Sequence, residues 1–136
     1  MSKLRYFAGA LLIAASSAPW LALAQQATIP PLQTQGIAKF ACGGVGEPAS
    51  GAMQAARKDF PLSLQFATAS GEYMASINLT IKDAKGASVL TVPSTGPICL
   101  IKLPDGNYSI DAQAMGKTKS QAVTVGGGPK AIDFSF

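Results

Sequence analysis

Residues 73–81 read Tyr-Met-Ala-Ser-Ile-Asn-Leu-Thr-Ile, and apart from Met74 they show one simple pattern. An apolar residue stands at every second position, which is typical of a β-strand with one face in a core and the other toward water. The same period of two recurs in six further segments after Phe60: residues 62–66, 88–92, 98–103, 108–114, 123–125 and 132–136. Such short strands bury their apolar faces only when two sheets pair or a barrel closes. We therefore predict an all-β, seven-stranded antiparallel β-sandwich.

One short helix is expected before these strands. Residues 37–42 suit a short strand, and the glycines that follow them force a turn. Pro48 is well placed for a first helical turn, and Arg57 and Lys58 stand near the last one. Between them four apolar residues fall on one helix face: Ala49, Ala52, Met53 and Ala56. Because this stripe is mostly alanine, we expect the helix to rest on a face of the sheet.

The first 24 residues have the layout of a cleavable export signal. Lys3 and Arg5 precede a mostly apolar stretch at residues 8–15, and Ala22-Leu23-Ala24 precedes Gln25 as a small-residue cleavage site. We expect residues 1–24 to be a signal peptide, residues 25–36 a flexible leader and residues 37–136 the β-sandwich domain. The expected location is the periplasm, with secretion as an alternative. No membrane span is expected after cleavage.

The composition excludes most kinds of catalytic site. The chain has 11 Lys and Arg, 7 Asp and Glu and no His, which excludes Ser-His-Asp, Cys-His and His-ligated zinc chemistry. Without Lys3 and Arg5 the net charge falls from +4 to +2, too little to favour nucleic acid as a partner. We predict a protein that is not an enzyme and uses no cofactor or metal. A small hydrolase that uses carboxylates stays open if Glu47 and Glu72 converge in a cleft.

Cys42 and Cys99 are the only cysteines in the sequence. Export would place them where a disulfide forms and persists, and an even pair favours a bridge. The loop-entropy model gives such a bridge about 4 kcal/mol of stability. A redox or metal-binding role is the alternative, but the sequence has no Cys-x-x-Cys motif.

The glycine-rich stretch before the helix is a candidate contact surface. Residues 44–49 read Gly-Val-Gly-Glu-Pro-Ala, which fits the dinucleotide pattern G-x-G-x-x-A in form. Short, numerous strands follow instead of a doubly wound sheet, and Glu47 would repel the anion, so a tight turn is the simpler interpretation. We take Gly43, Gly44, Gly46, Glu47 and Tyr73 as a possible contact rim. The loops at residues 70–73 and 93–97 are further contact candidates, because loops on a rigid sandwich often carry contacts.

Lysines are spread along the predicted strands. Lys117 and Lys119 share one strand face, while others lie elsewhere along the sheet: Lys82, Lys85, Lys102 and Lys130. Such charges normally keep a sheet face soluble and discourage edge pairing. A functional basic patch is the alternative.

Residues 103–112 read Leu-Pro-Asp-Gly-Asn-Tyr-Ser-Ile-Asp-Ala and are followed by Gly116 and the strand at 123–125. This segment resembles the carboxypeptidase regulatory-like domains of the transthyretin-like, or prealbumin-like, sandwich class. The resemblance covers about the last 60 residues and implies a prealbumin-like sandwich that accompanies other proteins without being a peptidase. An immunoglobulin-like sandwich is the alternative, because Asp105 to Tyr108 is similar to a tyrosine corner. Against it, Ile110 stands where that pattern has Cys.

Taken together, these features predict a noncatalytic binding or accessory module in the bacterial periplasm. Its partner would be an envelope protein or a ligand that the sequence does not identify, and the module would be a monomer or a weak oligomer. A structural or adhesion-type module that self-associates through its strands is the alternative. A hydrolase is the remaining, less favoured reading.

Overall fold

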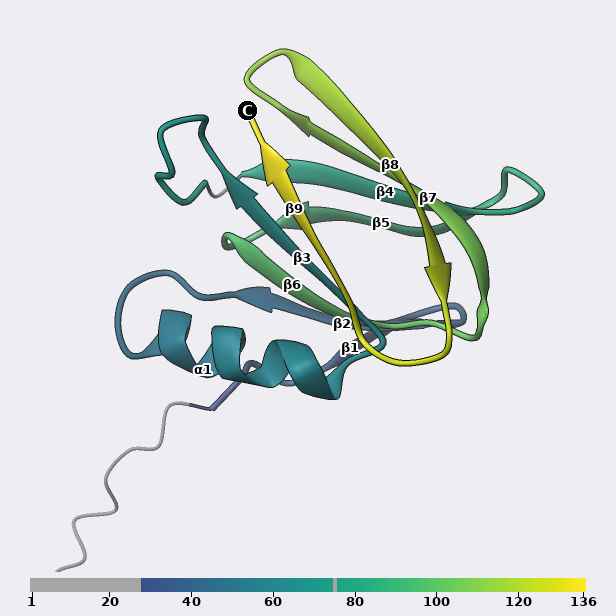
Figure 1. Ribbon diagram of the computed structural model, residues 1–136, viewed down its shortest axis with the longest axis horizontal. Helices are drawn as coiled ribbons and strands as arrows, with labels where there is room; N and C mark the ends of the chain where they lie inside the picture. The colour runs from purple at the N-terminus through teal and green to yellow at the C-terminus, as the bar shows by residue number, and fades with distance from the viewer. Residues whose placement is uncertain (1–27, 75) are drawn as a thin grey trace, which may run out of the picture.

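Two β-sheets make up most of the described chain (Figure 1). The computed structural model describes residues 28–74 and 76–136, so the expected signal peptide and the start of the expected leader lie outside the described residues. The first sheet has the strand order β1-β2-β6-β3-β9, and the second has the order β5-β4-β7-β8. The strands are β1 (Gln33–Gln35), β2 (Ala38–Gly43), β3 (Leu62–Ala67), β4 (Ile77–Asp83), β5 (Ser88–Ser94), β6 (Ile98–Lys102), β7 (Gly106–Ala114), β8 (Lys117–Val125) and β9 (Lys130–Ser135). The helices are α1 (Ala49–Ala56) and the 3-10 helix η1 (Arg57–Asp59).

The predicted all-β arrangement of two sheets is confirmed, but the predicted count of seven strands is wrong. The described residues form nine strands. The count of seven covered only strands after the helix, whereas β1 and β2 precede it. The short β1 falls in the segment expected to be a leader and pairs antiparallel with β2, Gln35 lying opposite Ala38. Its sequence Gln-Thr-Gln is exposed throughout and has no apolar alternation, which is why the pattern did not predict it.

The sheets are also not wholly antiparallel. β3 and β9 run parallel, with Leu62 opposite Lys130 at one end and Ala67 opposite Ser135 at the other. The whole second sheet lies between these two strands in the sequence, and a long connection of this kind is what a parallel pair requires. The rings of Phe66 and Phe134 stack on this pair, with their centroids 5.6 Å apart.

The strand at residues 73–81 begins later than its alternation predicts. β4 starts at Ile77, and Ser76 just before it has a positive φ of 68°, which breaks the extended backbone. Tyr73 instead forms an isolated antiparallel bridge with Ala67 at the end of β3. Ala75 lies outside the described residues. Tyr73, Met74 and Ser76 therefore belong to a loop rather than to β4.

Both sheets contribute to one apolar core. Leu64 and Phe66 of the first sheet and Leu79 and Ile110 of the second have no exposed surface. Full burial of one such side chain stabilises the folded state by roughly 1.5–3 kcal/mol. The alternation read from the sequence therefore identifies the inward-facing side of these strands correctly.

The predicted helix is confirmed at residues 49–56, and it does rest on a sheet. α1 covers part of the outer face of the first sheet, where a second small core contains Met53, Phe60, Ile98 and Leu100 (Figure 1). Ile98 and Leu100 lie on the side of β6 that faces away from the main core, so β6 is buried on both faces. This explains why its run of residues is almost continuously apolar.

Arg57 fastens the end of the helix to the sheet. Its Nε donates a hydrogen bond to Ser63 Oγ at 2.9 Å, and its Nη1 donates to Gln65 Oε1 at 2.8 Å, both on β3. Its Nη2 lies 2.9 Å from Asp133 Oδ1 on β9. The Arg57 side chain is only 13% exposed, so these bonds satisfy a guanidinium that has lost most of its water.

Candidate functional site

Four connections that are distant in the sequence meet at one end of the two sheets. Gly43 at the end of β2 and Gln65 near the end of β3 are both paired with Ile98 at the start of β6. Ser94 at the end of β5 is paired with Ile77 at the start of β4. β7 ends beside the start of β4, so its turn into β8 lies at this end as well.

We call this region the loop end, and it occupies the left and the top of Figure 1. It consists of residues 44–48, 68–74, 95–97 and 115–116. Three segments were considered as contact surfaces from the sequence: residues 43–47, which we call the glycine rim, residues 70–73 and residues 93–97. All three lie at or beside the loop end. Strand order, which the sequence does not reveal, is what brings them together.

The glycine rim depends on backbone conformations that suit glycine. Gly44 has a φ of 93° and Gly46 a φ of 74°, both in the region that other residues rarely adopt. Gly96 packs directly on the main chain of Gly43, and a Cβ at Gly96 would overlap it. Ser50 Oγ at the start of α1 donates a hydrogen bond to the carboxylate of Glu47 at 3.4 Å. The rim is therefore a tightly turned segment held from both sides.

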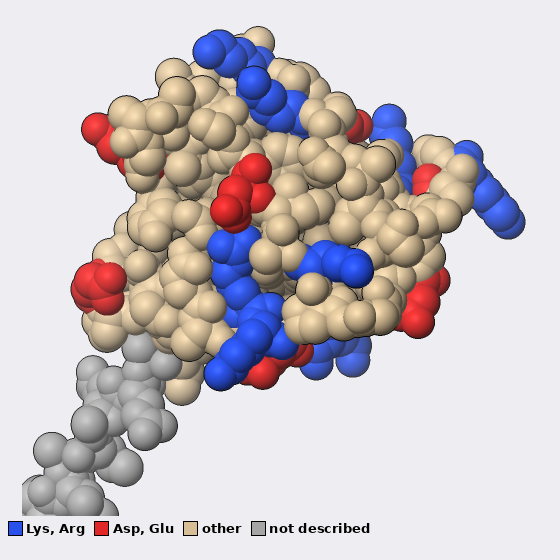
Figure 2. All heavy atoms as spheres, viewed as in Figure 1, with Lys and Arg blue, Asp and Glu red and all other residues tan. Residues whose placement is uncertain are grey.

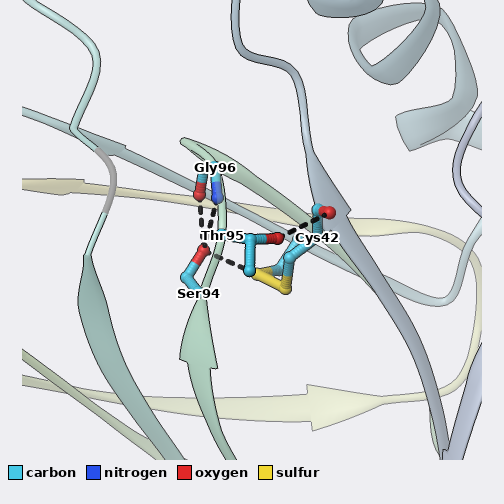
Figure 3. The surroundings of a disulfide bond; sticks show 5 residues. Cys42, Ser94, Thr95 and Gly96 are labelled. Carbon is cyan, nitrogen blue, oxygen red and sulfur yellow. Dashed lines mark hydrogen bonds between the residues drawn. A yellow bond between two sulfur atoms is a disulfide. The ribbon is translucent and has the colours of Figure 1, made fainter.

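The predicted disulfide between Cys42 and Cys99 is confirmed, and it lies beneath the loop end (Figure 3). The two cysteines are direct partners across β2 and β6. The β5–β6 connection folds over them: Thr95 Oγ1 donates to the main-chain oxygen of Cys42 at 3.2 Å, and Ser94 Oγ lies 3.4 Å from Cys99 Sγ. Ser94 Oγ also donates to the oxygen of Gly96. The disulfide thus joins the end of β2, where residues 44–48 begin, to the start of β6, where residues 95–97 end.

Tyr73 lies on the neighbouring loop and reaches toward the helix. Its hydroxyl oxygen accepts a hydrogen bond from Gln54 Nε2 at 3.4 Å, and the same amide nitrogen donates to Gln65 Oε1 at 2.7 Å. Half of the Tyr73 side chain remains exposed. Within this loop, the main-chain N–H of Glu72 donates to Thr68 Oγ1 at 3.1 Å. Tyr73 is therefore oriented by contacts but still accessible.

Three large apolar side chains are exposed at the loop end, each on a different loop. Val45 is 66% exposed, Tyr73 50% and Met115 70%. Sequence reasoning named Tyr73 but missed Val45 and Met115. Val45 stands between two turn-forming glycines, and Met115 precedes Gly116 in a tight hairpin turn where both residues have positive φ. An apolar residue placed in such a turn is the signal that could have identified both.

A groove of about 210 Å³ opens beside the loop end, at the seam between β2 and β5. Uncharged residues line it: Pro30, Pro31, Gln33, Phe40, Ala41, Cys42, Val92, Pro93 and Thr95. A groove of this size suits one apolar side chain of a partner better than a whole ligand of drug size.

The opposite end of the sheets holds the one described group with a clear pKa shift. Burial, and then the charges of Asp83 and Asp105, raise the pKa of Tyr108 above its usual value of 10.0. The Tyr108 hydroxyl donates to the main-chain oxygen of Pro104 at 2.7 Å. A shallow hollow of about 240 Å³ lies next to it. The hydrogen bond from Tyr108 to Pro104 ties the start of β7 to the turn before it.

The arrangement at the loop end suits contact better than acid–base chemistry. The carboxylate of Glu47 is held by Ser50, while Glu72 stands on a separate loop, and neither lines the groove beside the loop end. Among residues 28–74 and 76–136, no three His, Cys, Asp or Glu side chains come together as a metal site. No helix in this described part of the chain is long and apolar enough to cross a membrane.

No protein-family model matches this chain, and no curated protein matches it in sequence.

Proposed function

We propose that the protein is a noncatalytic binding or accessory module of the bacterial periplasm that contacts a partner protein through the loop end. One observation carries the proposal: Val45, Tyr73 and Met115 are exposed on three separate loops at the same end of the molecule. Exposed aromatic residues and Met are enriched in protein contact surfaces. The Cys42–Cys99 disulfide supports the proposed export, because such bonds persist in oxidising compartments.

The geometry of the loops also favours binding. The rim is fixed by the Gly43–Gly96 contact and by the disulfide beneath it. Loops that are already ordered lose little conformational entropy on binding, which leaves more of the contact energy for affinity. The neighbouring groove provides a place for one apolar side chain of the partner. The resemblance of residues 103–112 to carboxypeptidase regulatory-like domains fits an accessory role and stays a proposal.

The proposal is tested by capturing partners from an envelope extract with three matched proteins. One is the unaltered chain, one carries Val45→Ser, Tyr73→Ser and Met115→Ser, and one carries Thr91→Ser, Thr118→Ser and Thr124→Ser on the second sheet. We expect the same proteins to be enriched by the unaltered and the threonine-substituted chains and to be lost with the loop-end variant. Equal recovery with all three chains would overturn the proposal.

A self-associating structural module is a second candidate, and β8 is the observation that favours it. This strand, Lys117–Val125, is nine residues long, pairs on one side with β7 and is exposed along most of its length. The main chain of an edge strand can pair with another copy, although its lysines discourage this. Sedimentation over a range of concentrations decides the matter. Concentration-dependent dimers that Ser120→Pro abolishes would favour this candidate, and a monomer throughout would exclude it.

A further inference from the structure

A second exposed surface lies at the opposite end of the first sheet. Gly36 and Ile37 form the two-residue turn between β1 and β2, and the Ile37 side chain is 56% exposed. Lys39 follows on β2, and its direct partner across the strands is Lys102 of β6. Both lysines are exposed on the outer face, because their neighbours Ala38 and Ile101 point into the core.

The Lys39–Lys102 pair is unfavourable by itself. Like charges directly opposite each other on neighbouring strands repel. The two salt bridges among the described residues are Arg57–Asp133 and Lys82–Asp111, so neither Lys39 nor Lys102 has an acidic partner there. The ammonium of Lys102 lies 5.4 Å from the centre of the Phe60 ring, which orients this side chain without neutralising it.

Another lysine stands two residues before Phe60, whose ring the Lys102 ammonium faces. Lys58 is exposed at this position. The acidic residue nearest to Lys58 in sequence is its exposed neighbour Asp59. Figure 2 shows a group of basic side chains in the lower centre of the view, with an acidic side chain among them, and further basic side chains at the top and at the right; the left margin shows acidic ones. We name Ile37, Lys39, Lys58 and Lys102 the basic patch. It joins one exposed apolar side chain to three lysines.

These observations favour a flat anionic surface as the occupant. Lys39 and Lys102 project from the outer sheet face, and neither lines the groove or the hollow described above, which could enclose a small anion. An exposed aliphatic residue in a turn, flanked by lysines, matches the pattern by which peripheral proteins touch membranes: the apolar residue enters the headgroup region and the lysines attract anionic lipids. We infer that the basic patch docks the protein reversibly on a bilayer that contains anionic phospholipids.

This docking leaves the loop end free. The basic patch and the loop end lie at opposite ends of the strands of the first sheet, because β2 begins at Ala38 and ends at Gly43. Val45 and Tyr73 therefore lie outside the basic patch. The inference does not depend on the proposed function of the loop end, and the two are tested with different variants.

Vesicle sedimentation tests the inference directly. The whole chain is expressed and purified in the form that the cell accumulates, so that every variant has the same N-terminus. We expect binding to vesicles of phosphatidylcholine with phosphatidylglycerol, much less binding to phosphatidylcholine alone, and a decrease with added sodium chloride. Lys39→Gln with Lys102→Gln should weaken binding about fivefold per lysine, or roughly 25-fold together. Ile37→Ser should weaken it several-fold without any change in charge.

The matched control is Lys117→Gln with Lys119→Gln, which removes the same charge from β8. We expect this variant to bind the anionic vesicles like the unaltered chain. An equal loss in the control would overturn the inference, because net charge alone would then explain binding. Absence of binding at low salt would overturn it as well. So would full competition by inorganic phosphate at constant ionic strength together with unchanged binding of Ile37→Ser, because the patch would then be a site for soluble anions.

Discussion

The side chain of Gln35 makes two hydrogen bonds to the main chain of Thr91. Gln35 Nε2 donates to the oxygen of Thr91 at 3.2 Å, and the N–H of Thr91 donates to Gln35 Oε1 at 2.7 Å. The amide thus occupies both hydrogen-bonding groups of one residue on β5, an edge strand of the second sheet. It joins the first sheet to the second and protects an edge that would otherwise be open to another chain.

Replacing Gln35 should therefore loosen this seam. We expect Gln35→Ala to lower the free energy of unfolding by about 1 kcal/mol, because the two bonds are exposed to water. Urea denaturation measures the change. Gln33→Ala on the same strand is the control and should have little effect. If Gln35→Ala and Gln33→Ala were equally stable, the two hydrogen bonds of Gln35 to Thr91 would not contribute to the free energy of unfolding.

Replacing Arg57 should cost more. Arg57→Ala removes the three hydrogen bonds to Ser63, Gln65 and Asp133, and we expect a loss of about 2 kcal/mol. Arg57→Lys should recover little, because an ammonium cannot reproduce the planar fork. Asp133→Asn should cost under about 1 kcal/mol, because the Asp133 side chain is 73% exposed and water screens its charge. Thermal unfolding monitored by circular dichroism would test this order, and an Asp133→Asn loss as large as that of Arg57→Ala would contradict it.

The raised pKa of Tyr108 predicts a loss of stability at alkaline pH. The unfolded chain ionises this phenol near its usual pKa of 10.0, whereas the folded protein keeps the proton to higher pH. The contribution of the protonated Tyr108 to the free energy of unfolding is therefore fully present below pH 10.0, and it is lost as the pH rises through the folded-state pKa. Urea denaturation at a series of pH values should show a weaker alkaline decline for Tyr108→Phe. Parallel declines in both proteins would show that Tyr108 is not responsible.

The disulfide should contribute a large share of the total stability. Cys42 and Cys99 are 57 residues apart, and a crosslink over that distance restricts the unfolded chain by about 4 kcal/mol in the loop-entropy model. We expect the variant Cys42→Ala with Cys99→Ala to lose this amount in urea denaturation. Reduced wild-type protein should lose a similar amount. A double variant as stable as the oxidised protein would contradict this assignment.

Much of the fold follows from local pattern. Leu64, Leu79 and Ile110 were expected to point inward from their alternation alone, and all three are fully buried. The helix at residues 49–56 follows from its apolar spacing. The pairing of Cys42 with Cys99 needed only the count of cysteines and the expectation of export. The buried alternation and the helix depend on residues that are close in sequence. The disulfide depends on there being only one possible pair of cysteines.

The rest depends on how distant segments meet. The parallel pairing of β3 with β9 and the convergence of the loops at one end follow from strand order, which no local pattern contains. β1 is held by its partner strand and by the Gln35–Thr91 contact rather than by an apolar face. Val45 and Met115 were not predicted as contact residues, because an isolated apolar residue in a turn belongs to no periodic pattern. The basic patch arises from Lys39 and Lys102, which are distant in sequence and adjacent in the sheet.

Photo-crosslinking in living cells tests the binding role of the loop end most directly. A photoreactive amino acid is placed at Val45, Tyr73 or Met115, and at Ala84 in the turn at the opposite end as a control. We predict one common crosslinked species for the three loop-end positions and none of that mass for Ala84. Crosslinks from Ala84 to the same species, or no crosslinked species from any loop-end position, would contradict the proposed role.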